Sequence, residues 1–182
     1  MEMLDSVKLT IAPMLTGELA RIWAARNKLD KLVPALNARV RLRGASRLGS
    51  RVTLRGHPTV SNEGLLTVGD RVRLVSTVAT LELVSLPGGH LEIGENTLIN
   101  YGSSLVASNH VKVGKDCLIG THVMIMDCDF HRVEDKTWDT TGSPIIIEDR
   151  VWICNRSIIC KGVRIGHDAV VAGVPARVVR EF

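Results

Sequence analysis

Aromatic residues are scarce in this chain of 182 residues, which has one Tyr, two Phe and three Trp, or 3% in all. Compact sandwiches and α/β domains usually depend on aromatic bulk in their cores. Hydrophobic residues still make up 45% of the sequence, so the core must consist mainly of Val, Ile, Leu and Ala. Such a core indicates narrow, regular layers in a chain long enough for one domain.

The sequence also lacks a CxxC pair and any long apolar run. Its four cysteines have no zinc-ligand spacing, and we interpret them as small buried thiols of a reducing compartment. The acidic residues Glu2 and Asp5 near the start predict neither a signal peptide nor a membrane span. The expected location is the cytoplasm.

Positive charge is concentrated at the start of the chain. Residues 1–56 hold eleven Lys or Arg against four Asp or Glu, a net +7, whereas the whole chain nets +4. A basic segment can serve a nucleic-acid or membrane partner, but no aromatic-interleaved basic patch or nucleic-acid motif accompanies it. We interpret it as a solvated face and expect no nucleic-acid partner.

An aliphatic residue recurs every six positions over much of the chain, often followed by Gly. These lead positions are Ile93, Ile99, Leu105, Val113, Ile119, Ile125, Ile147, Ile153, Ile159, Ile165 and Val171, with looser coils led by Leu48 and Val68. Four positions after each lead the residue is usually small or β-branched, as at Thr97 and Ser103. A period of six fits neither an amphipathic helix nor an alternating strand. It predicts a triangular coil of three short strands, with both positions pointing inward and Gly taking positive-φ corners.

A helix is predicted ahead of the coils, with Thr16 as its N-cap and a run that reaches Leu29. Its basic polar face leaves two roles open: peripheral contact with a membrane, or a cap over the open end of the coils, whose strand edges would otherwise be exposed. We favour the cap. The predicted organisation is a helical cap over 1–38 and a coil domain over 39–182, with a loop at 131–146.

The hexads resemble those of the hexapeptide-repeat acyltransferases. The most specific stretches are INYG at 99–102, IMDCDFH at 125–131, VWI at 151–153 and the closing segment 172–180. The nearest branch resembles the maltose, galactoside and surface-polysaccharide O-acetyltransferases. The resemblance implies an all-β fold, a left-handed parallel β-helix, that usually forms homotrimers with sites between neighbours. It also implies acetyl transfer from acetyl-coenzyme A to a sugar hydroxyl, in the synthesis of a polysaccharide or lipid-linked glycan.

The hexads stop at His131 and resume at Ile147, with a polar segment between them. A loop that leaves a rigid coil is a usual place for a binding cleft. A hydroxyl that attacks a thioester must lose its proton, and an imidazole that is largely neutral at pH 7 can accept it. His131 also matches the family's catalytic histidine, so we expect it to be the general base.

The resemblance assigns further residues to the acceptor side. Asn100 matches a family asparagine in the acceptor and acyl-group site, where an amide can both donate and accept hydrogen bonds. Tyr101 follows it and is expected to line the same pocket. Asp127 and Asp129 precede His131 at alternate positions, and they either orient its ring and bind the sugar or are simply solvated.

On the donor side, Trp152 matches a tryptophan beside the acyl-donor channel; its alternative is a surface tryptophan covering a coil. We expect Asn155, Arg177 and Arg180 to complete the cofactor-binding set, because arginine suits the phosphates of coenzyme A.

Three histidines raise a metal alternative, since some left-handed β-helices bind zinc between subunits. His110, His122 and His131 are twelve and nine residues apart, which does not match the close pair of those sites, so no metal is expected. The turn histidines His57, His90 and His167 are interpreted as solvated.

The chain departs from the family near its end, where it passes from Val171 directly to the segment AGVP at 172–175. Relatives carry a further coil there that helps to hold coenzyme A. This departure leaves two alternatives open besides O-acetylation: a catalytically silent scaffold, and N-acetylation of a nucleotide-linked amino sugar, which would need the same base.

Overall fold

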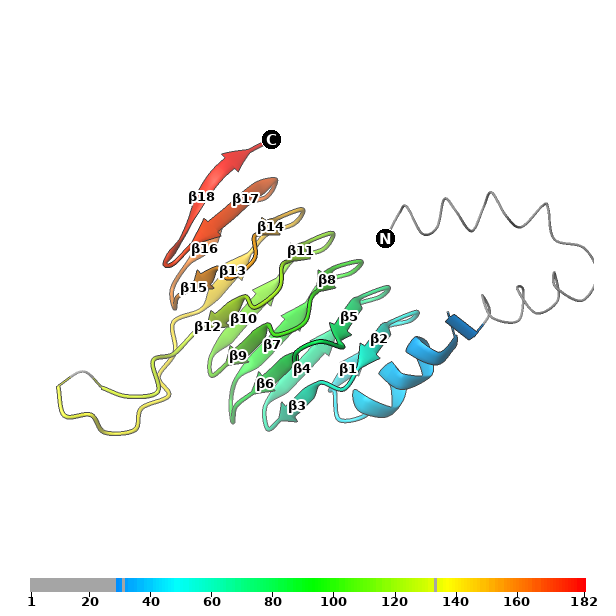
Figure 1. The fold of residues 1–182 in the computed structure, drawn as a ribbon. Coiled ribbons are helices and arrows are strands. Elements are labelled where there is room, and N and C mark those ends of the chain that lie inside the picture. The colour runs from blue at the N-terminus through cyan, green and yellow to red at the C-terminus, as the bar shows by residue number, and fades with distance from the viewer. Residues whose placement is uncertain (1–28, 31, 133) are drawn as a thin grey trace, which may run out of the picture.

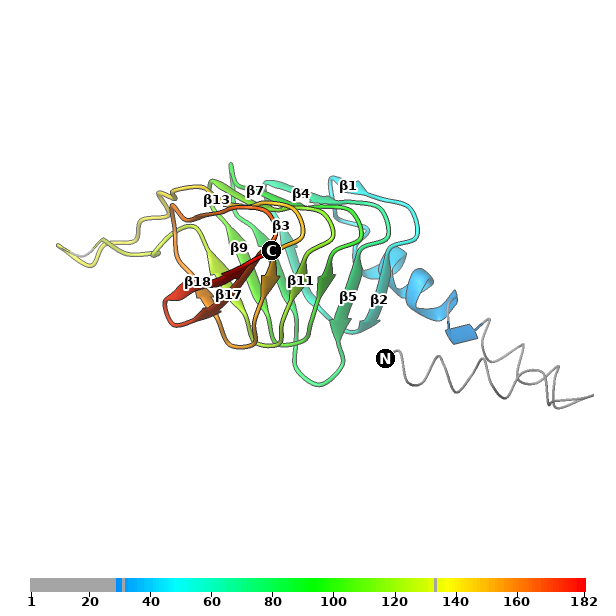
Figure 2. The ribbon, with the colours of Figure 1, turned by 90° about the horizontal axis from the view of Figure 1, so that it is seen from above.

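The computed structural model describes residues 29, 30, 32–132 and 134–182 of the chain. Its strands form three sheets that wrap around one core (Figures 1 and 2). The first sheet contains β1 (Arg47–Leu48), β4 (Leu65–Val68), β7 (His90–Ile93), β10 (His110–Val113), β13 (Ile145–Ile147) and β16 (Arg164–Ile165). The second contains β2 (Thr53–Gly56), β5 (Arg73–Ser76), β8 (Leu98–Ile99), β11 (Leu118–Ile119), β14 (Trp152–Ile153), β17 (Ala169–Gly173) and β18 (Ala176–Glu181). The third contains β3 (Thr59–Asn62), β6 (Glu82–Ser85), β9 (Ser104–Ala107), β12 (Met124–Met126) and β15 (Ile158–Ile159).

The chain visits the three sheets in turn, so each set of three strands makes one coil. Neighbouring coils pair in parallel and in register, as Val68 pairs with Ile93 and Ile93 with Val113. The parallel β-helix predicted from the hexads is confirmed. The antiparallel pair β17–β18 ends the stack.

Inward-pointing aliphatic residues fill the interior. All eleven lead positions from Ile93 to Val171 are exposed by 3% or less, and Thr97, Ser103 and Cys117, four positions after their leads, are fully buried. The strands alternate between buried and solvent-facing residues, which is the pattern of a sheet with one covered face. The core therefore consists of stacked layers of aliphatic side chains, as the scarcity of aromatics predicts.

The glycines that follow the lead residues have a different role from the expected one. A Cβ at Gly94 would lie 2.4 Å from the carbonyl carbon of Gly114 in the next coil, so glycine permits close stacking of the corners. Positive φ angles occur two residues later, at Asn96 (58°) and Asp116 (57°). Asparagine and aspartate tolerate this left-handed conformation better than most residues.

A helix over residues 32–41, with 29 and 30 also helical, lies beside the first coil. Ala38 and Leu42 are buried. The Asn37 side-chain amide donates to the backbone oxygens of Leu54 and Gly56, at 3.1 and 2.8 Å, which satisfies acceptors on the edge strand β2. This helix crosses the expected boundary between residues 38 and 39. The helix predicted from Thr16 lies, apart from Leu29, outside the described residues.

Two features mark the later coils. The segment between β12 and β13 leaves the stack as a long loop, drawn in yellow in Figure 1. The last coil has a strand in the first and second sheets, but the third sheet ends at β15.

In the described part of the chain, no helix has both the length and the apolar character required to cross a bilayer.

Candidate functional site

Hydrogen bonds close the base of the loop onto the coils. The backbone N–H of Ser143 donates to the Asp127 carbonyl at 2.8 Å, and the Asn109 side-chain amide donates to the Gly142 carbonyl at 3.0 Å. A Cβ at Gly142 would lie 2.5 Å from Ser108 Oγ, so glycine allows the returning chain to pass close to the corner between β9 and β10. The loop therefore projects from a fixed base.

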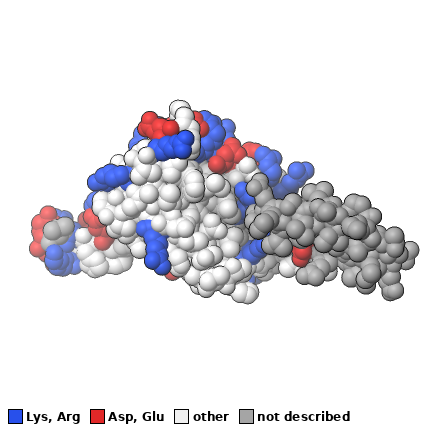
Figure 3. All heavy atoms as spheres, turned by 45° about the horizontal axis from the view of Figure 1, so that its top comes forward, with Lys and Arg blue, Asp and Glu red and all other residues white. Residues whose placement is uncertain are grey.

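His131 lies at this base and lines a groove of about 330 Å³. The groove is bounded by Asp129, His131, Arg132, Glu134, Asp139, Thr141 and Lys161. Figure 3 shows both signs of charge gathered at the tip of the loop, beside a largely uncharged face of the coils. Carboxylates, a guanidinium and an imidazole in one groove offer both donors and acceptors, which a polyhydroxylated ligand requires.

Trp138 holds the imidazole of His131 on one side. The two residues form a β-bridge across the loop, and their rings meet edge to face with 5.4 Å between centroids. Phe130 packs against the same indole, also with 5.4 Å between centroids. Trp138 was not among the predicted site residues; its signal in the sequence is that it is a large aromatic residue within a mainly polar segment.

Asp127 is fully buried. Its two carboxylate oxygens accept the backbone N–H groups of Ser108 and Asn109 at 2.7 and 2.9 Å. Both oxygens thus serve the neighbouring corner, and the structure gives Asp127 a part in supporting the loop base.

Asp129 is exposed and lines the groove, where it pairs with Lys161. Hydrogen bonding to Asp129 raises the pKa of Lys161, which keeps that ammonium charged. Deeper in the loop, hydrogen bonds from Thr141 lower the pKa of Asp139. At neutral pH the groove therefore contains fixed charges of both signs around His131.

Asn100 and Tyr101 lie where the strands of the third sheet begin, opposite the edge from which the loop leaves. Asn100 follows β8, half-buried, and its side-chain amide donates to the Ile119 carbonyl of the next coil at 3.2 Å. Tyr101 meets the ring of His122 edge-on, with 5.7 Å between centroids. Both residues therefore mark the corner between the second and third sheets.

One protomer does not bring Asn100 and His131 together. Asn100 precedes β9, whereas His131 follows β12, the next strand of the same parallel sheet. A four-residue strand spans roughly 13 Å, so the two side chains lie at opposite ends of this face. A site that uses both would need a second copy of the chain.

Two of the donor-side residues, Trp152 and Arg180, lie in one row across strands of the second sheet. Trp152 is 50% exposed on β14, it pairs with Val170 of β17, and Val170 pairs with Arg180 of β18. Leu118 continues the row on the other side of Trp152. An exposed indole two strands from a guanidinium is an arrangement that can hold an apolar arm and a phosphate.

Asn155 and Arg177 lie near the same sheet. Asn155 stands at the corner after β14, where its side-chain oxygen accepts the Thr121 N–H at 2.9 Å. Arg177 pairs with Ala172 across β17 and β18, and its guanidinium donates to the Ala176 carbonyl at 2.9 Å. Part of the hydrogen-bonding capacity of both residues is thus used within the chain.

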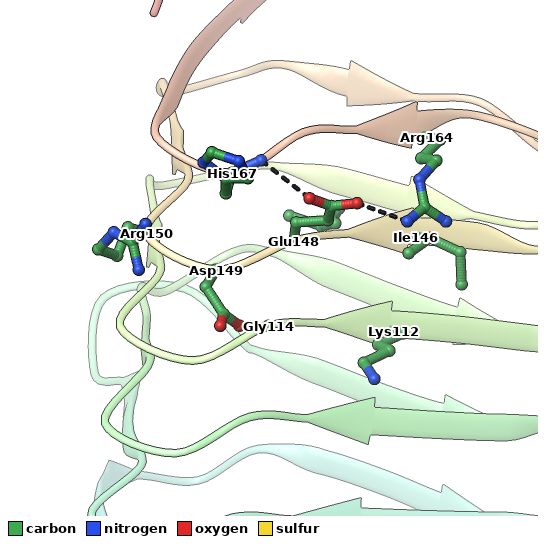
Figure 4. Close-up of a pocket in the computed structure, with 9 residues that line it drawn as sticks. Lys112, Gly114, Ile146, Glu148, Asp149, Arg150, Arg164 and His167 are labelled. Atoms are coloured by element: carbon green, nitrogen blue, oxygen red, sulfur yellow. Dashed lines mark hydrogen bonds and ion pairs between the residues drawn. The ribbon is translucent and has the colours of Figure 1, made fainter. Parts of the chain in front are cut away.

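A second groove, of about 350 Å³, was not predicted from the sequence (Figure 4). It crosses β10, β13 and β16, and most of its lining residues are charged and pair with one another or with residues beside the groove. Glu148 accepts from the Arg164 guanidinium and from the His167 backbone N–H. Hydrogen bonds from Arg150 and His167 lower the pKa of Asp168. These contacts join successive coils across the first sheet and its corner.

The three histidines considered for zinc lie apart. His110 begins β10 in the first sheet, His122 stands at the corner between the second and third sheets, and His131 lies in the loop. Among the cysteines, Cys117 and Cys128 are buried, as expected, whereas Cys160 is exposed.

No family model matches the sequence. The chain is, however, 30% identical to the galactoside O-acetyltransferase of Escherichia coli, over 52% of this chain and 56% of that protein. A second relative, a protein of Dictyostelium discoideum described as an acetyltransferase, is 31% identical over 52% of this chain and 60% of its own. These matches agree with the hexads of the sequence and with the three-sheet coil of the structure. In sequence and in fold the chain resembles the hexapeptide-repeat acetyltransferases. It spans a little over half the length of these two relatives.

Solved structures of the same fold extend the comparison. A hexapeptide-repeat-containing acetyltransferase of Vibrio cholerae, complexed with acetyl-coenzyme A, superposes with a TM-score of 0.53 at 20% identity, covering 96% of this chain and 97% of that one. An N-acyltransferase of Bacillus cereus, in complex with dTDP and coenzyme A, gives a TM-score of 0.55 at 18% identity, covering 76% and 84%. At this identity the likeness concerns the fold.

Proposed function

We propose that this protein is an acetyl-coenzyme A-dependent O-acetyltransferase that acts on a sugar hydroxyl. The observation that carries the proposal is His131, which lines the charged groove at the base of the loop and is held by Trp138. The O-acetyltransferase relative supports the choice of reaction.

The reaction is a direct transfer in a ternary complex. The acceptor hydroxyl oxygen attacks the thioester carbonyl carbon as the hydroxyl proton passes to an imidazole nitrogen of His131. The tetrahedral intermediate then expels the coenzyme A thiolate, which regains a proton from the imidazolium. General-base help of this kind contributes roughly 10²–10⁴ in rate. Asn100 positions the acceptor or the acyl oxygen with its amide, and Tyr101 lines the same pocket.

A homotrimer would complete the site. Asn100 and His131 lie at opposite ends of the third sheet in one protomer, so each site is built between two copies. The exposed apolar residues Leu118, Met124 and Trp152 on the coils provide surface that neighbouring copies can cover. In this assembly Trp152 lines the acyl-donor channel, while Arg177, Arg180 and Asn155 bind the polar parts of coenzyme A.

The acceptor we favour is a sugar of a polysaccharide or a lipid-linked glycan in the cytoplasm. The basic segment 1–56 would then lie near the anionic inner face of a membrane that carries such a substrate. Asp129 and Lys161, which face the groove, would hydrogen-bond the sugar.

Particular observations favour two alternative functions. N-acylation is favoured by the fold shared with the N-acyltransferase of Bacillus cereus, and an amine acceptor would use the same base. A silent scaffold is favoured by the last coil, whose path ends without a strand in the third sheet.

The decisive experiment measures thiol release from acetyl-coenzyme A with a panel of sugar and amino-sugar acceptors, for the wild type and for His131→Ala. Acceptor-dependent release that falls by about 10²-fold or more in the variant supports the proposal. Release that survives the substitution would remove His131 from its role. A lack of both turnover and coenzyme A binding would identify the scaffold.

A further inference from the structure

Two histidines of the first sheet lie side by side because their positions differ by one coil. His90 begins β7 and His110 begins β10, and the parallel register pairs them directly. Glu92 lies two residues after His90, on the same face of the strand. The spacing of twenty residues thus brings together two histidines that lie far apart in the sequence.

Their side chains form a compact donor set on the outer face of the sheet. The two imidazole rings are stacked, with 5.0 Å between centroids and 4° between planes. One donor atom from each of His90, Glu92 and His110 lies within 4.8 Å of the other two. All three residues are half-buried.

The distance between His110 and Glu92 matches the edge of a zinc coordination tetrahedron. His110 Nε2 lies 3.5 Å from Glu92 Oε2. Two ligands bound to Zn²⁺ at about 2.0–2.1 Å in tetrahedral geometry are separated by about 3.3 Å. The His110 Nε2 atom is moreover buried and has no hydrogen-bond partner, which is costly for a ring nitrogen unless another group satisfies it.

Neighbouring residues orient this donor set. Thr67 Oγ1 lies 3.2 Å from His90 Nε2, and a ligating histidine commonly uses its second nitrogen for a hydrogen bond of this kind. Lys112 Nζ lies 3.7 Å from Glu92 Oε1, so the two carboxylate oxygens face different partners. The oxygen that faces His110 remains available to a cation.

From this geometry we propose that His90, Glu92 and His110 form a divalent-metal site with a preference for Zn²⁺. Two imidazoles and one carboxylate are a usual set of three protein ligands for zinc, and water supplies the fourth position. Because the two rings are stacked nearly parallel, their in-plane lone pairs do not converge, so His90 turns out of the stack to reach the ion; its donor atom lies within 4.8 Å of the others. The bound ion links β7 to β10 and so stabilises two successive coils. It lies on the first sheet, outside the residues proposed for acyl transfer.

The test is equilibrium dialysis of the untagged, metal-stripped full chain against Zn²⁺, with the bound metal quantified. We expect saturable binding of one ion per chain, with an affinity lower by at least about tenfold in both His110→Asn and Glu92→Gln. Zn²⁺ should also raise the midpoint of thermal unfolding of the wild type and leave that of His110→Asn unchanged.

Matched controls separate this site from adventitious binding. His57→Asn removes an exposed histidine elsewhere on the coils and should leave the affinity unchanged. Co²⁺ bound in place of Zn²⁺ should give a spectrum without thiolate charge-transfer bands, which excludes the exposed Cys160 as a ligand. Failure of the wild type to bind, equal binding by His110→Asn and Glu92→Gln, or a thiolate spectrum would each overturn the proposal.

Discussion

The imidazole of His131 lies edge-on to the indole of Trp138, with 5.4 Å between ring centroids and 86° between ring planes. The two residues are joined by a β-bridge, and the Asp139 N–H donates to the Phe130 carbonyl at 2.9 Å. The loop therefore folds back on itself to place an aromatic ring beside the proposed base. The orientation of His131 depends on the loop as well as on the coil.

Trp138→Ala should lower acetyl transfer without unfolding the protein. Trp138 is 67% exposed, so its removal leaves the core intact, but the imidazole loses the ring that orients it. Misplacement of a catalytic group by about 1 Å can cost about 10²-fold, and we expect kcat to fall by roughly tenfold to 10²-fold. The measurement is the steady-state kinetics of thiol release.

Trp152→Ala is the matched control for that experiment. Its indole is also exposed, at 50%, but on the donor face, so the substitution should mainly raise the KM for acetyl-coenzyme A. Identical effects of the two substitutions on kcat and KM would argue against separate roles for the two tryptophans.

Asp127→Ala should destabilise the fold. The buried carboxylate accepts two backbone N–H groups, and hydrogen bonds to a charged group contribute about 1.5–3 kcal/mol each. Loss of the acceptor leaves both donors unsatisfied, so we expect the free energy of unfolding to fall by about 2–4 kcal/mol in urea denaturation.

Asp129→Ala, two residues further on, provides the comparison. Its exposed ion pair with Lys161 is screened by solvent and should contribute little to the free energy of unfolding. A larger loss of stability in Asp129→Ala than in Asp127→Ala would contradict the assigned roles.

These two aspartates illustrate how much of the fold and of the candidate site can be predicted from the sequence. The hexads predict the coil because a strict period of six forces the same positions inward in every turn, and each lead from Ile93 to Val171 is buried as expected. The period breaks at the loop, where no repeat determines which of Asp127 and Asp129 turns inward. The contact between His131 and Trp138 depends on how the loop folds. The pairing of His90 with His110 depends on the register between coils.

The buried thiol of Cys117 predicts a loss of stability at alkaline pH. The pKa of this thiol is raised from 9.0 to about 11, and burial is the largest cause of the increase. Below about pH 9 the thiol is neutral in both states. Between about pH 9 and 11 the unfolded state ionises while the folded state does not, so the free energy of unfolding falls as the pH rises.

The loss should reach about 2 kcal/mol at the upper end of that range, where the folded-state thiol is itself half ionised, because each pKa unit corresponds to about 1.4 kcal/mol. Urea midpoints at several pH values, for the wild type and Cys117→Ala, measure it. The variant has no thiol at this position and should show a smaller alkaline loss. Parallel pH profiles for the two proteins would be evidence against this assignment.

Adjacent residues of β11 offer a direct test of the layered core. Ile119 is fully buried, whereas its neighbour Leu118 is 42% exposed, since successive side chains of a strand face opposite sides of the sheet. Ile119→Ala removes part of one interior layer, and the rigid coils above and below it limit collapse into the cavity. We expect the free energy of unfolding to fall by about 2–5 kcal/mol.

Leu118→Ala should lower the stability of the protomer by about 1 kcal/mol or less, because much of this side chain already contacts solvent in the single chain. Any larger effect should depend on protein concentration, since the proposed trimer would cover Leu118. Chemical denaturation at two protein concentrations therefore reports both the contribution of this core layer to stability and the contribution of the proposed trimer. A concentration-independent loss as large as that of Ile119→Ala would mean that Leu118 is packed within its own chain.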